Sequence, residues 1–293
     1  MFLTIFTPSY NRAHLLPKLF ESILAQNAKN FEWIIVDDGS IDNTEEVVEG
    51  FRRIADFSII YFRKKNEGKH LAINKGVELA KGKLFFIVDS DDYLVNSASE
   101  LIQKYYLQIQ NENSLGGISF RRGYSVTKPI GTTRKFNDFI ADIFTFRYYE
   151  NIKGDMAEVY KTEVIREFPF PKIEGEKYCP ESLIWNRIGL KYKLLWTSHI
   201  IYICEYLKDG LTDRIVKIRT ESPQYASLYY SEFCSMRTPL VQKIKGGINF
   251  WRFAFNDETR SLKEKQRQLP NKLFIFLIPL GYALYLNDKR VHL

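Results

Sequence analysis

The sequence predicts an α/β fold followed by a helical C-terminal region. Over the first hundred residues, short apolar runs rich in β-branched and aromatic residues alternate with helical patterns. This alternation is typical of βαβ units, which form parallel sheets with right-handed crossovers. With 293 residues, 45% of them hydrophobic and 15% aromatic, the chain has ample material for a core.

The strand-like runs come first in this prediction, and helices connect most of them. The runs cover residues 2–7, 32–37, 58–63 and 83–89. The first helix carries apolar residues that step by three or four, as a helix packed on a sheet requires. These residues are Leu15, Leu16, Leu19, Phe20, Ile23 and Leu24.

The second helix is predicted to start near Asp42. Asp42 and Glu45 have the spacing of a capping box, and acidic residues suit a first helical turn. Its expected buried face consists of Val47, Val48, Phe51 and Ile54.

The third helix has an unusually small face. Ala72, Gly76 and Ala80 recur at every fourth position, so this face can approach a strand or ligand closely. Gly76 costs about 1 kcal/mol relative to alanine in a helix interior, which indicates that close approach is useful there. Gly82 is expected to end the helix.

Ligands of open α/β sheets bind at the carboxyl ends of the strands. Three sets of residues are predicted to meet there: Thr7, Pro8, Tyr10 and Asn11 after the first strand, Asp37 and Asp38 after the second, and Asp89 to Asp92 after the fourth.

The stretch LFFIVDSDDYL places three carboxylates within four positions, and their mutual repulsion calls for a nearby positive charge. A D-x-D at a strand end sets alternate side chains on one side, with the carboxylates about 7 Å apart. Asp89 and Asp91 could therefore share a hydrated cation, or divide it with a ribose. The alternative is a helix N-cap cluster, with Asp91 or Asp92 capping a helix near Ser97. For Asp37 to Ser40, a tight turn at Gly39 is the simpler interpretation.

Other nucleotide signatures are missing. Residues 63–70, RKKNEGKH, lack the first glycine and the final Ser or Thr of a P-loop, and no GxGxxG follows the first strand. No sequence pattern of nucleic-acid recognition accompanies the basic residues, so nucleic acid is not expected as a partner.

Three motifs in order, TPSYNR (7–12), VDDGSIDNT (36–44) and NEGKHLAINKGVELAKGKLFFIVDSDD (66–92), carry a resemblance to a known family. The chain resembles the family 2 glycosyltransferases, most strongly in its first third. The resemblance implies the GT-A fold, a Rossmann-like mixed sheet flanked by helices. It also implies transfer of a sugar from a nucleoside diphosphate, usually UDP-linked, to an acceptor hydroxyl with inversion.

By this resemblance, residues can be given roles in donor binding. Pro8 and Tyr10 would enclose the uracil, Asp38 would accept its imide N–H, and Asp89 would contact the ribose. Asp91, with Asp89, would hold Mn²⁺ or Mg²⁺ against the diphosphate. The remaining nucleotide-binding residues are Thr7, Lys69 and Ser90.

Inversion in one displacement requires a base for the acceptor proton. Glu181 is expected to be that base, at the start of a helix after Pro180, although the helix dipole favours a glutamate there in any case. The family often has Glu-Asp at this point, whereas this chain has Glu181-Ser182. Asp155 is expected on the acceptor side. A turn is expected at Asp209-Gly210. Either its loop closes over the donor phosphates, as in related chains, or the turn has no role in function.

The predicted division is a GT-A catalytic domain over residues 1–215 and a helical region over 216–293. The formal charge of +7 lies entirely in the C-terminal part, where residues 237–293 hold 11 Lys or Arg against 4 Asp or Glu. The apolar segment 273–286 would span about 21 Å as a helix, short of a bilayer core of roughly 30 Å, so a full crossing is not expected. It is expected to lie on an anionic membrane surface, or else to pack on the catalytic domain or on a second subunit in a homodimer.

The three cysteines, Cys179, Cys204 and Cys234, are widely spread, and no apolar signal segment precedes the first strand, so a cytoplasmic location is expected. The sequence thus predicts a metal-dependent inverting glycosyltransferase at the cytoplasmic face of the membrane, acting on a glycan or lipid-linked acceptor. The alternative is a catalytically inactive nucleotide-sugar-binding scaffold. A phosphatase with Asp89 as nucleophile is disfavoured, because Asp92 follows the motif and the motif ends the fourth strand.

Overall fold

The computed structural model describes residues 1–205 and 214–292. The chain divides into two compact units. The first comprises Met1–Phe170 and Arg187–Tyr206, and the second comprises Pro171–Asn186 and Leu207–Leu293. The predicted functional boundary at residue 215 stays a prediction.

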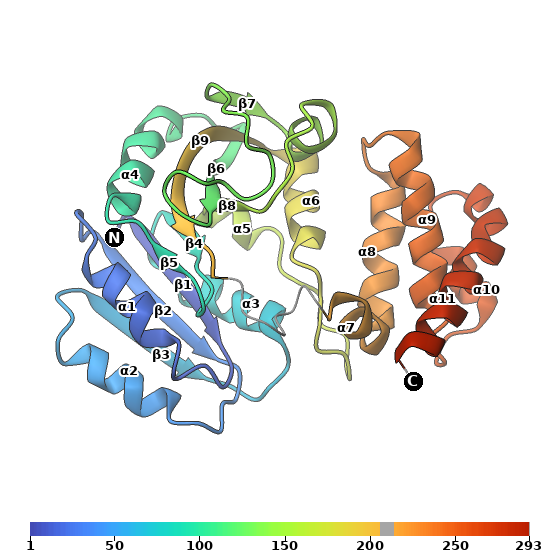
Figure 1. Ribbon diagram of the computed structural model, residues 1–293, viewed down its shortest axis with the longest axis horizontal. Helices are drawn as coiled ribbons and strands as arrows, with labels where there is room; N and C mark the ends of the chain where they lie inside the picture. Colours follow the sequence, from blue (N-terminus) through green and yellow to red (C-terminus); the bar gives the residue numbers. More distant parts are fainter. Residues whose placement is uncertain (206–213, 293) are drawn as a thin grey trace. The chain divides into compact units, whose positions relative to one another are not determined.

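A mixed sheet forms the centre of the first unit (Figure 1), with strand order β3-β2-β1-β4-β8-β6-β9-β5 and β7 paired to β9. The predicted parallel pairing is confirmed for β3, β2, β1 and β4. β8 is antiparallel to both β4 and β6, so the sheet is mixed. The strands are β1 Leu3–Ser9, β2 Phe31–Asp37, β3 Ser58–Arg63, β4 Leu84–Ile87, β5 Tyr93–Leu94, β6 Leu115–Gly123, β7 Phe139–Ala141, β8 Met156–Lys161 and β9 Lys193–Ile203.

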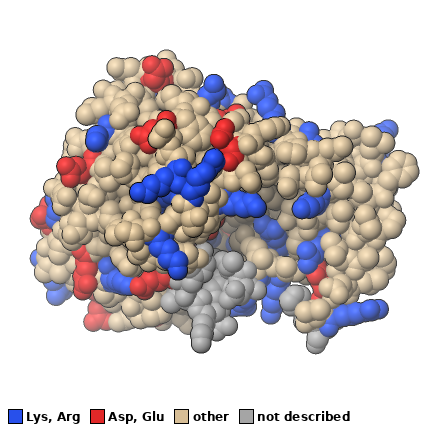
Figure 2. Space-filling model, turned by 45° about the horizontal axis from the view of Figure 1, so that its top comes forward, with Lys and Arg blue, Asp and Glu red and all other residues tan. Residues whose placement is uncertain are grey.

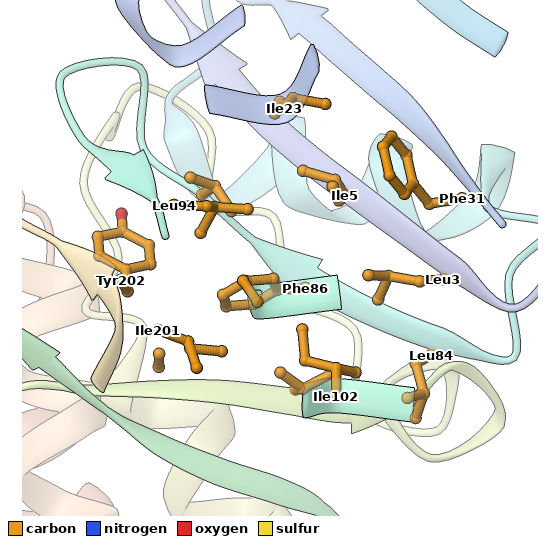
Figure 3. Packing of buried hydrophobic residues seen from close by; sticks show 14 of the residues in the cluster. Leu3, Ile5, Ile23, Phe31, Leu84, Phe86, Leu94, Ile102, Ile201 and Tyr202 are labelled. Carbon is orange, nitrogen blue, oxygen red and sulfur yellow. The ribbon is translucent and has the colours of Figure 1, made fainter. Parts of the chain in front are cut away.

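Helices cover both faces of this sheet. They are α1 Leu16–Leu24, α2 Thr44–Arg52, α3 Lys69–Leu79, α4 Ala98–Ile109, the π-helical turn η1 Thr145–Tyr149, α5 Thr162–Arg166 and α6 Ser182–Lys191, which runs from the second unit into the first. Alternate strand residues such as Leu3, Ile5 and Phe86 form one core with Ile23 of α1 and Ile102 of α4 (Figure 3). Because successive side chains of a strand point to opposite faces, every second side chain of these strands lies on this face.

The small face of α3 does approach the sheet. A Cβ atom on Gly76 would lie 2.2 Å from Cε2 of Phe6, so only glycine fits against this ring. The prediction for Gly82 was wrong. The helix ends at Leu79 with Ala80 as its C-cap, whereas Gly82 is small because a Cβ there would lie 2.4 Å from the backbone nitrogen of Thr4.

Two details of α2 also differ from expectation. The helix begins one residue after Asn43, which makes no side-chain cap, so the capping box of Asp42 and Glu45 is absent. Asp42 instead accepts hydrogen bonds from the N–H and hydroxyl of Thr44. Ile54 lies beyond the helix and is 64% exposed, because the helix ends before the apolar stripe does.

The second unit is helical, as predicted. Its helices are α7 Ile215–Glu221, α8 Pro223–Ser235, α9 Leu240–Ala254, α10 Leu262–Gln268, the 3₁₀ helix η2 Lys272–Leu277 and α11 Ile278–His292. Phe250, Trp251 and Phe253 of α9 form its core with residues of α8 and η2. Within the described ranges, no helix combines the length and hydrophobicity that a membrane crossing needs.

Segment 171–186 belongs to the second unit through its contacts with α8. The buried carboxylate of Glu176 accepts the backbone N–H groups of Gln224 at 2.7 Å and Tyr225 at 2.8 Å. These are orphan donors of the first turn of α8, so Glu176 caps this helix from a distant part of the sequence. In the opposite direction, the N–H of Tyr178 donates to the hydroxyl of Ser222, the residue before α8, at 3.2 Å.

Candidate functional site

The ends of β1 and β2 are joined by hydrogen bonds in the loops that follow them. The N–H of Asp38 donates to the carbonyl of Ser9 at 2.8 Å. Asn11 adopts a φ of 53°, in the left-handed region that asparagine tolerates. Its N–H donates to the hydroxyl of Ser40 at 2.8 Å, and its side-chain oxygen accepts the N–H of Ile41 at 2.9 Å. These bonds hold the TPSYN and DDGS motifs side by side.

Asp38 connects β2 to the start of α3. Its buried carboxylate accepts the ammonium of Lys64 at 2.7 Å, the N–H of Glu67 at 3.0 Å and the N–H of Gly68 at 2.7 Å. A carboxylate offers about four acceptor positions, so three donors leave room for one more. Its neighbour Asp37 completes the turn predicted at Gly39, where φ is 86°, by accepting the N–H of Ser40.

Asp89, at the end of β4, faces two cationic side chains. Lys69 of α3 approaches its carboxylate to 2.5 Å, and Arg122 of β6 approaches it to 3.6 Å. Burial alone would raise the pKa of Asp89, but these two cations outweigh it and lower the pKa to about 2. Asp89 is therefore a fully ionised carboxylate held between α3 and β6.

Asp91 and Asp92 are less well compensated. Arg12 lies 3.8 Å from Asp91, and burial together with the charge of Asp89 raises the pKa of Asp91. Burial and the charge of Asp89 also raise the pKa of Asp92, to about 6. The hydrogen bond that Asp92 accepts from Tyr202 lowers this pKa but does not offset them. The backbone N–H of Glu205 is the second donor to Asp92, at 3.0 Å.

Arg122 and Tyr202 contact the turn from Asp89 to Asp92, which we call the acidic turn, and the sequence did not predict either contact. The guanidinium of Arg122 stacks over the Tyr202 ring at 4.2 Å and donates through Nε to the carbonyl of Met156 at 2.9 Å. It also lies 4.0 Å from Asp92. A signal was present in the sequence, because Arg121 and Arg122 interrupt the otherwise apolar strand at residues 115–123.

The positive charge that the three carboxylates require is thus supplied, at least partly, by the protein itself. From the sequence, a metal ion was the expected source of this charge, whereas the structure places Lys69, Arg122 and Arg12 around the carboxylates. The described part of the chain holds no cluster of three His, Cys, Asp or Glu residues suited to a metal ion. Asp91 is nevertheless suited to a divalent cation. Its carboxylate is partly exposed, and burial and the charge of Asp89 disfavour its ionised form, which a bound cation would stabilise.

The other predicted nucleotide-binding residues have different exposures. Tyr10 is 47% exposed, whereas Pro8 and Ser90 are buried. Thr7 is fully buried inside β1, and its hydroxyl accepts the indole N–H of Trp33 at 3.0 Å. The structure therefore brings Asp38, Lys69, Asp89 and Asp91 to one edge of the sheet, with Tyr10 exposed in the neighbouring loop. Thr7 presents no free side chain there.

Asp155 is exposed and directly precedes β8, after Gly154 with a φ of 99°. Because β8 runs antiparallel to β4, its beginning lies beside the end of β4. Two residues into β8, burial raises the pKa of Glu158 to about 7 although Arg147 lies 3.9 Å away.

Glu181 lies in the second unit, where its carbonyl accepts the N–H groups of Ile184 and Trp185 at the start of α6. The residue as a whole is partly buried. The roles predicted for Glu181 and Asp155 stay predictions. The predicted turn at Asp209-Gly210 lies outside the described residues.

Comparison with known proteins identifies the family. The sequence model of glycosyl transferase family 2 matches residues 4–167, more than half of the chain. The chain therefore belongs to glycosyl transferase family 2, as its motifs predicted. The match covers β1 to α5, which include every carboxylate of the acidic turn.

Curated relatives are similar over part of the chain. Glycosyltransferase GlyA of Streptococcus pneumoniae is 28% identical over 179 residues, which cover 60% of this chain and 24% of that protein. An uncharacterized glycosyltransferase of Haemophilus influenzae is 29% identical over 179 residues, covering 60% of this chain and 69% of the relative. The chain thus spans about a quarter of the first of these relatives.

Solved structures share the fold. S. aureus TarS has a TM-score of 0.64 at 16% identity, over 97% of this chain and 54% of TarS. TarS 1–349 in complex with UDP-GlcNAc has a TM-score of 0.63 at 19% identity, over 97% of this chain and 84% of that one. Mannosyltransferase PcManGT from Pyrobaculum calidifontis, in complex with GDP-Man and Mn²⁺, has a TM-score of 0.57 at 16% identity, over 98% and 75%. These similarities confirm the predicted GT-A fold.

Proposed function

We propose that this chain transfers a sugar from a UDP-linked donor to a hydroxyl of a glycan or lipid-linked acceptor, with inversion at the anomeric carbon. The observation that carries the proposal is the meeting of Asp38, Asp89 and Asp91 with Lys69 at the carboxyl edge of the sheet, in a chain of glycosyl transferase family 2. Nucleotide-sugar complexes of two structures with the same fold, TarS with UDP-GlcNAc and PcManGT with GDP-Man and Mn²⁺, support the donor class.

Each side chain has a task in donor binding that follows from its chemistry. Asp38 has one acceptor position left for the uracil imide N–H, and Tyr10 with Pro8 encloses the base. Asp89 accepts a ribose hydroxyl, while Lys69 places its positive charge near the pyrophosphate. Asp91, with Asp89, holds Mn²⁺ or Mg²⁺, which when bound neutralises charge on the leaving diphosphate.

The transfer step needs a proton acceptor on the acceptor side. Glu181 takes the proton of the acceptor hydroxyl as its oxygen bonds to the anomeric carbon. The bond between that carbon and the diphosphate oxygen breaks, and the diphosphate leaves with the electron pair. Asp155 positions the acceptor, and the reaction takes place in the cytoplasm or at its face of the membrane.

Thermal stabilisation by nucleotides tests the donor class, because a ligand that binds only the folded protein raises the unfolding midpoint. UDP and a panel of UDP-sugars should raise the midpoint, and Mn²⁺ should increase the effect. In Asp91→Asn the manganese-dependent part should disappear while some stabilisation by UDP remains. If only GDP-linked sugars stabilise the protein, or if no nucleotide does, the proposed donor is wrong.

A further inference from the structure

An exposed apolar stripe runs along η2 and α11 of the second unit. Leu273, Phe276, Leu280 and Leu284 are 67%, 79%, 54% and 36% exposed. They follow each other at intervals of three, four and four residues, which places them on one side of a continuous helical segment. We call these four residues the apolar stripe. Such a series of large exposed apolar residues is the mark of an interaction surface.

An adjoining side of the same segment is firmly packed. Gly247 of α9 lies against Phe274, where an added Cβ would approach its ring to 2.6 Å. Gly281 of α11 lies against Trp251, where an added Cβ would approach the Trp251 Cβ to 2.3 Å, and the indole N–H of Trp251 donates to the carbonyl of Phe274 at 2.8 Å. The segment is therefore fixed by this packed side, and the apolar stripe lies on a neighbouring, exposed side.

Basic residues flank the apolar stripe at both ends. No charged residue occurs between Lys272 and Asp288. Asp288 is buried, and Arg252 neutralises it with two hydrogen bonds of 2.5 and 2.6 Å. Lys272 at one end and Lys289 with Arg290 at the other are exposed, and the ammonium of Lys289 lies 4.7 Å from the centre of the Tyr285 ring. Figure 2 shows the wider pattern on the side that it presents, where the helices of the second unit carry broad uncharged areas with more Lys and Arg than Asp and Glu.

An apolar stripe with basic residues at both ends favours one kind of binding partner over the others. A second copy packed through the same face would bring its own Lys272, Lys289 and Arg290 near these cations, which like charges oppose. None of the described helices is suited to crossing a bilayer. A helix that lies in the membrane surface has an apolar face with basic residues at its borders, and each basic residue there adds attraction to anionic lipids.

We propose that the apolar stripe docks on an anionic phospholipid surface, with Leu273, Phe276, Leu280 and Leu284 inserted among the acyl chains and Lys272, Lys289 and Arg290 at the headgroups. The inference rests on the second unit alone and does not depend on the proposed sugar transfer.

Flotation with lipid vesicles tests the apolar part. The full chain should float with vesicles of phosphatidylglycerol and phosphatidylcholine in a 3:7 ratio, and much less with phosphatidylcholine alone. Phe276→Glu combined with Leu280→Glu should reduce binding at least tenfold. The matched control is Leu107→Glu with Leu190→Glu, two leucines of the first unit that are 61% and 51% exposed; it should bind like the wild type.

Charge reversal tests the basic part. Lys289→Glu with Arg290→Glu should weaken binding to the anionic vesicles by about fivefold or more per position. Each basic residue near an anionic surface contributes about 1 kcal/mol of attraction, which corresponds to about fivefold in affinity. Arg53→Glu with Lys104→Glu makes the same change in net charge at exposed positions elsewhere and should leave most of the binding intact.

Three results would overturn the inference. The wild type could fail to bind the anionic vesicles, or the stripe variant could bind as well as its control. Sedimentation could instead show a dimer that Phe276→Glu dissociates, which would assign the stripe to a second copy. Stabilisation by UDP should persist in the stripe variant, so loss of vesicle binding is separable from any failure of the proposed transfer.

Discussion

The hydroxyl of Tyr202 donates a hydrogen bond to the carboxylate of Asp92 at 2.7 Å, and the same oxygen accepts the N–H of Asp89 at 2.9 Å. One side chain of β9 therefore holds both ends of the acidic turn that follows β4. The ring of Tyr202 also carries the guanidinium of Arg122. The geometry of the predicted metal and ribose ligands thus depends on a tyrosine more than a hundred residues away.

Tyr202→Phe should lower the free energy of unfolding by about 1–3 kcal/mol, because it leaves a buried N–H and a buried carboxylate without this partner. Urea denaturation at pH 7 measures the change. Tyr149→Phe, at a tyrosine that is 66% exposed, is the control and should change stability by less than about 0.5 kcal/mol. Equal effects of the two substitutions would show that the Tyr202 hydroxyl has no structural role.

Arg122→Met should be more destabilising, by about 3 kcal/mol, because it removes one of the two cations that compensate the partly buried carboxylate of Asp89. The pKa of Asp89 lies below its unfolded value, so its ionised form stabilises the protein above about pH 4. That contribution is lost as the pH falls toward 2 in the wild type. In Arg122→Met the folded pKa of Asp89 should lie closer to its unfolded value, so this contribution should be smaller and its loss should be complete at a higher pH. Arg122→Lys should restore part of the stability, and no recovery would argue that stacking on Tyr202 matters more than charge.

Glu158→Gln should change how stability depends on pH. Burial raises the folded pKa of Glu158 to about 7, above its unfolded value, so the wild type loses stability as the pH rises from about 4.5 to 7. The glutamine variant should lack this loss and gain about 2 kcal/mol relative to wild type at pH 8 compared with pH 5. Glu174→Gln, at an exposed position, should keep the wild-type slope. Parallel stability curves for Glu158→Gln and wild type would contradict the prediction.

Gly76→Ala tests the close approach of α3 to β1. Alanine is the better helix former by about 1 kcal/mol, yet overpacking against the Phe6 ring should give a net destabilisation of about 1–3 kcal/mol. Gly50 of α2 is a matched control, because a Cβ there would meet nothing within 4 Å. Gly50→Ala should stabilise the protein by about 0.5–1 kcal/mol. Changes of the same sign at both sites would rule out the steric explanation.

Glu181→Gln separates catalysis from binding. If Glu181 is the base, transfer should fall by about 10²–10⁴-fold while thermal stabilisation by UDP is kept. An unchanged transfer rate would exclude Glu181 as the base. If the wild type binds UDP-sugars but shows no transfer with any acceptor tried, the inactive scaffold becomes the better interpretation.

The sequence was sufficient for the first four strands and the helices between them, because their apolar periodicity is local and strong. It also located the acidic residues at the strand ends, since parallel strands necessarily bring those ends to one edge. The close approach at Gly76 was predictable from local pattern too, because small residues at every fourth position of a helix leave one of its faces free of bulky side chains.

Long-range contacts account for what the sequence did not reveal. Arg122 and Tyr202 reach the acidic turn from β6 and β9, and no local pattern specifies which strands become neighbours of β4. The capping box at Asp42 failed because Asp42 serves Thr44 and the N–H of Ala13 instead. Gly82 lies where a glycine often ends a helix. The structure shows instead that a side chain is excluded at residue 82 by the backbone of Thr4, which is far away in the sequence.

The cap that Glu176 provides to α8 has a practical consequence for anyone who wishes to express the two parts separately. A protein truncated after residue 215 would retain Glu176 but lose Gln224 and Tyr225, whose amides satisfy its carboxylate. The carboxylate would lose these donors, and segment 171–186, which includes Glu181, would lose the hydrogen bonds that hold it to α8. An inactive truncated enzyme would therefore say nothing against catalysis by the intact chain, and cutting the gene at that point is best avoided.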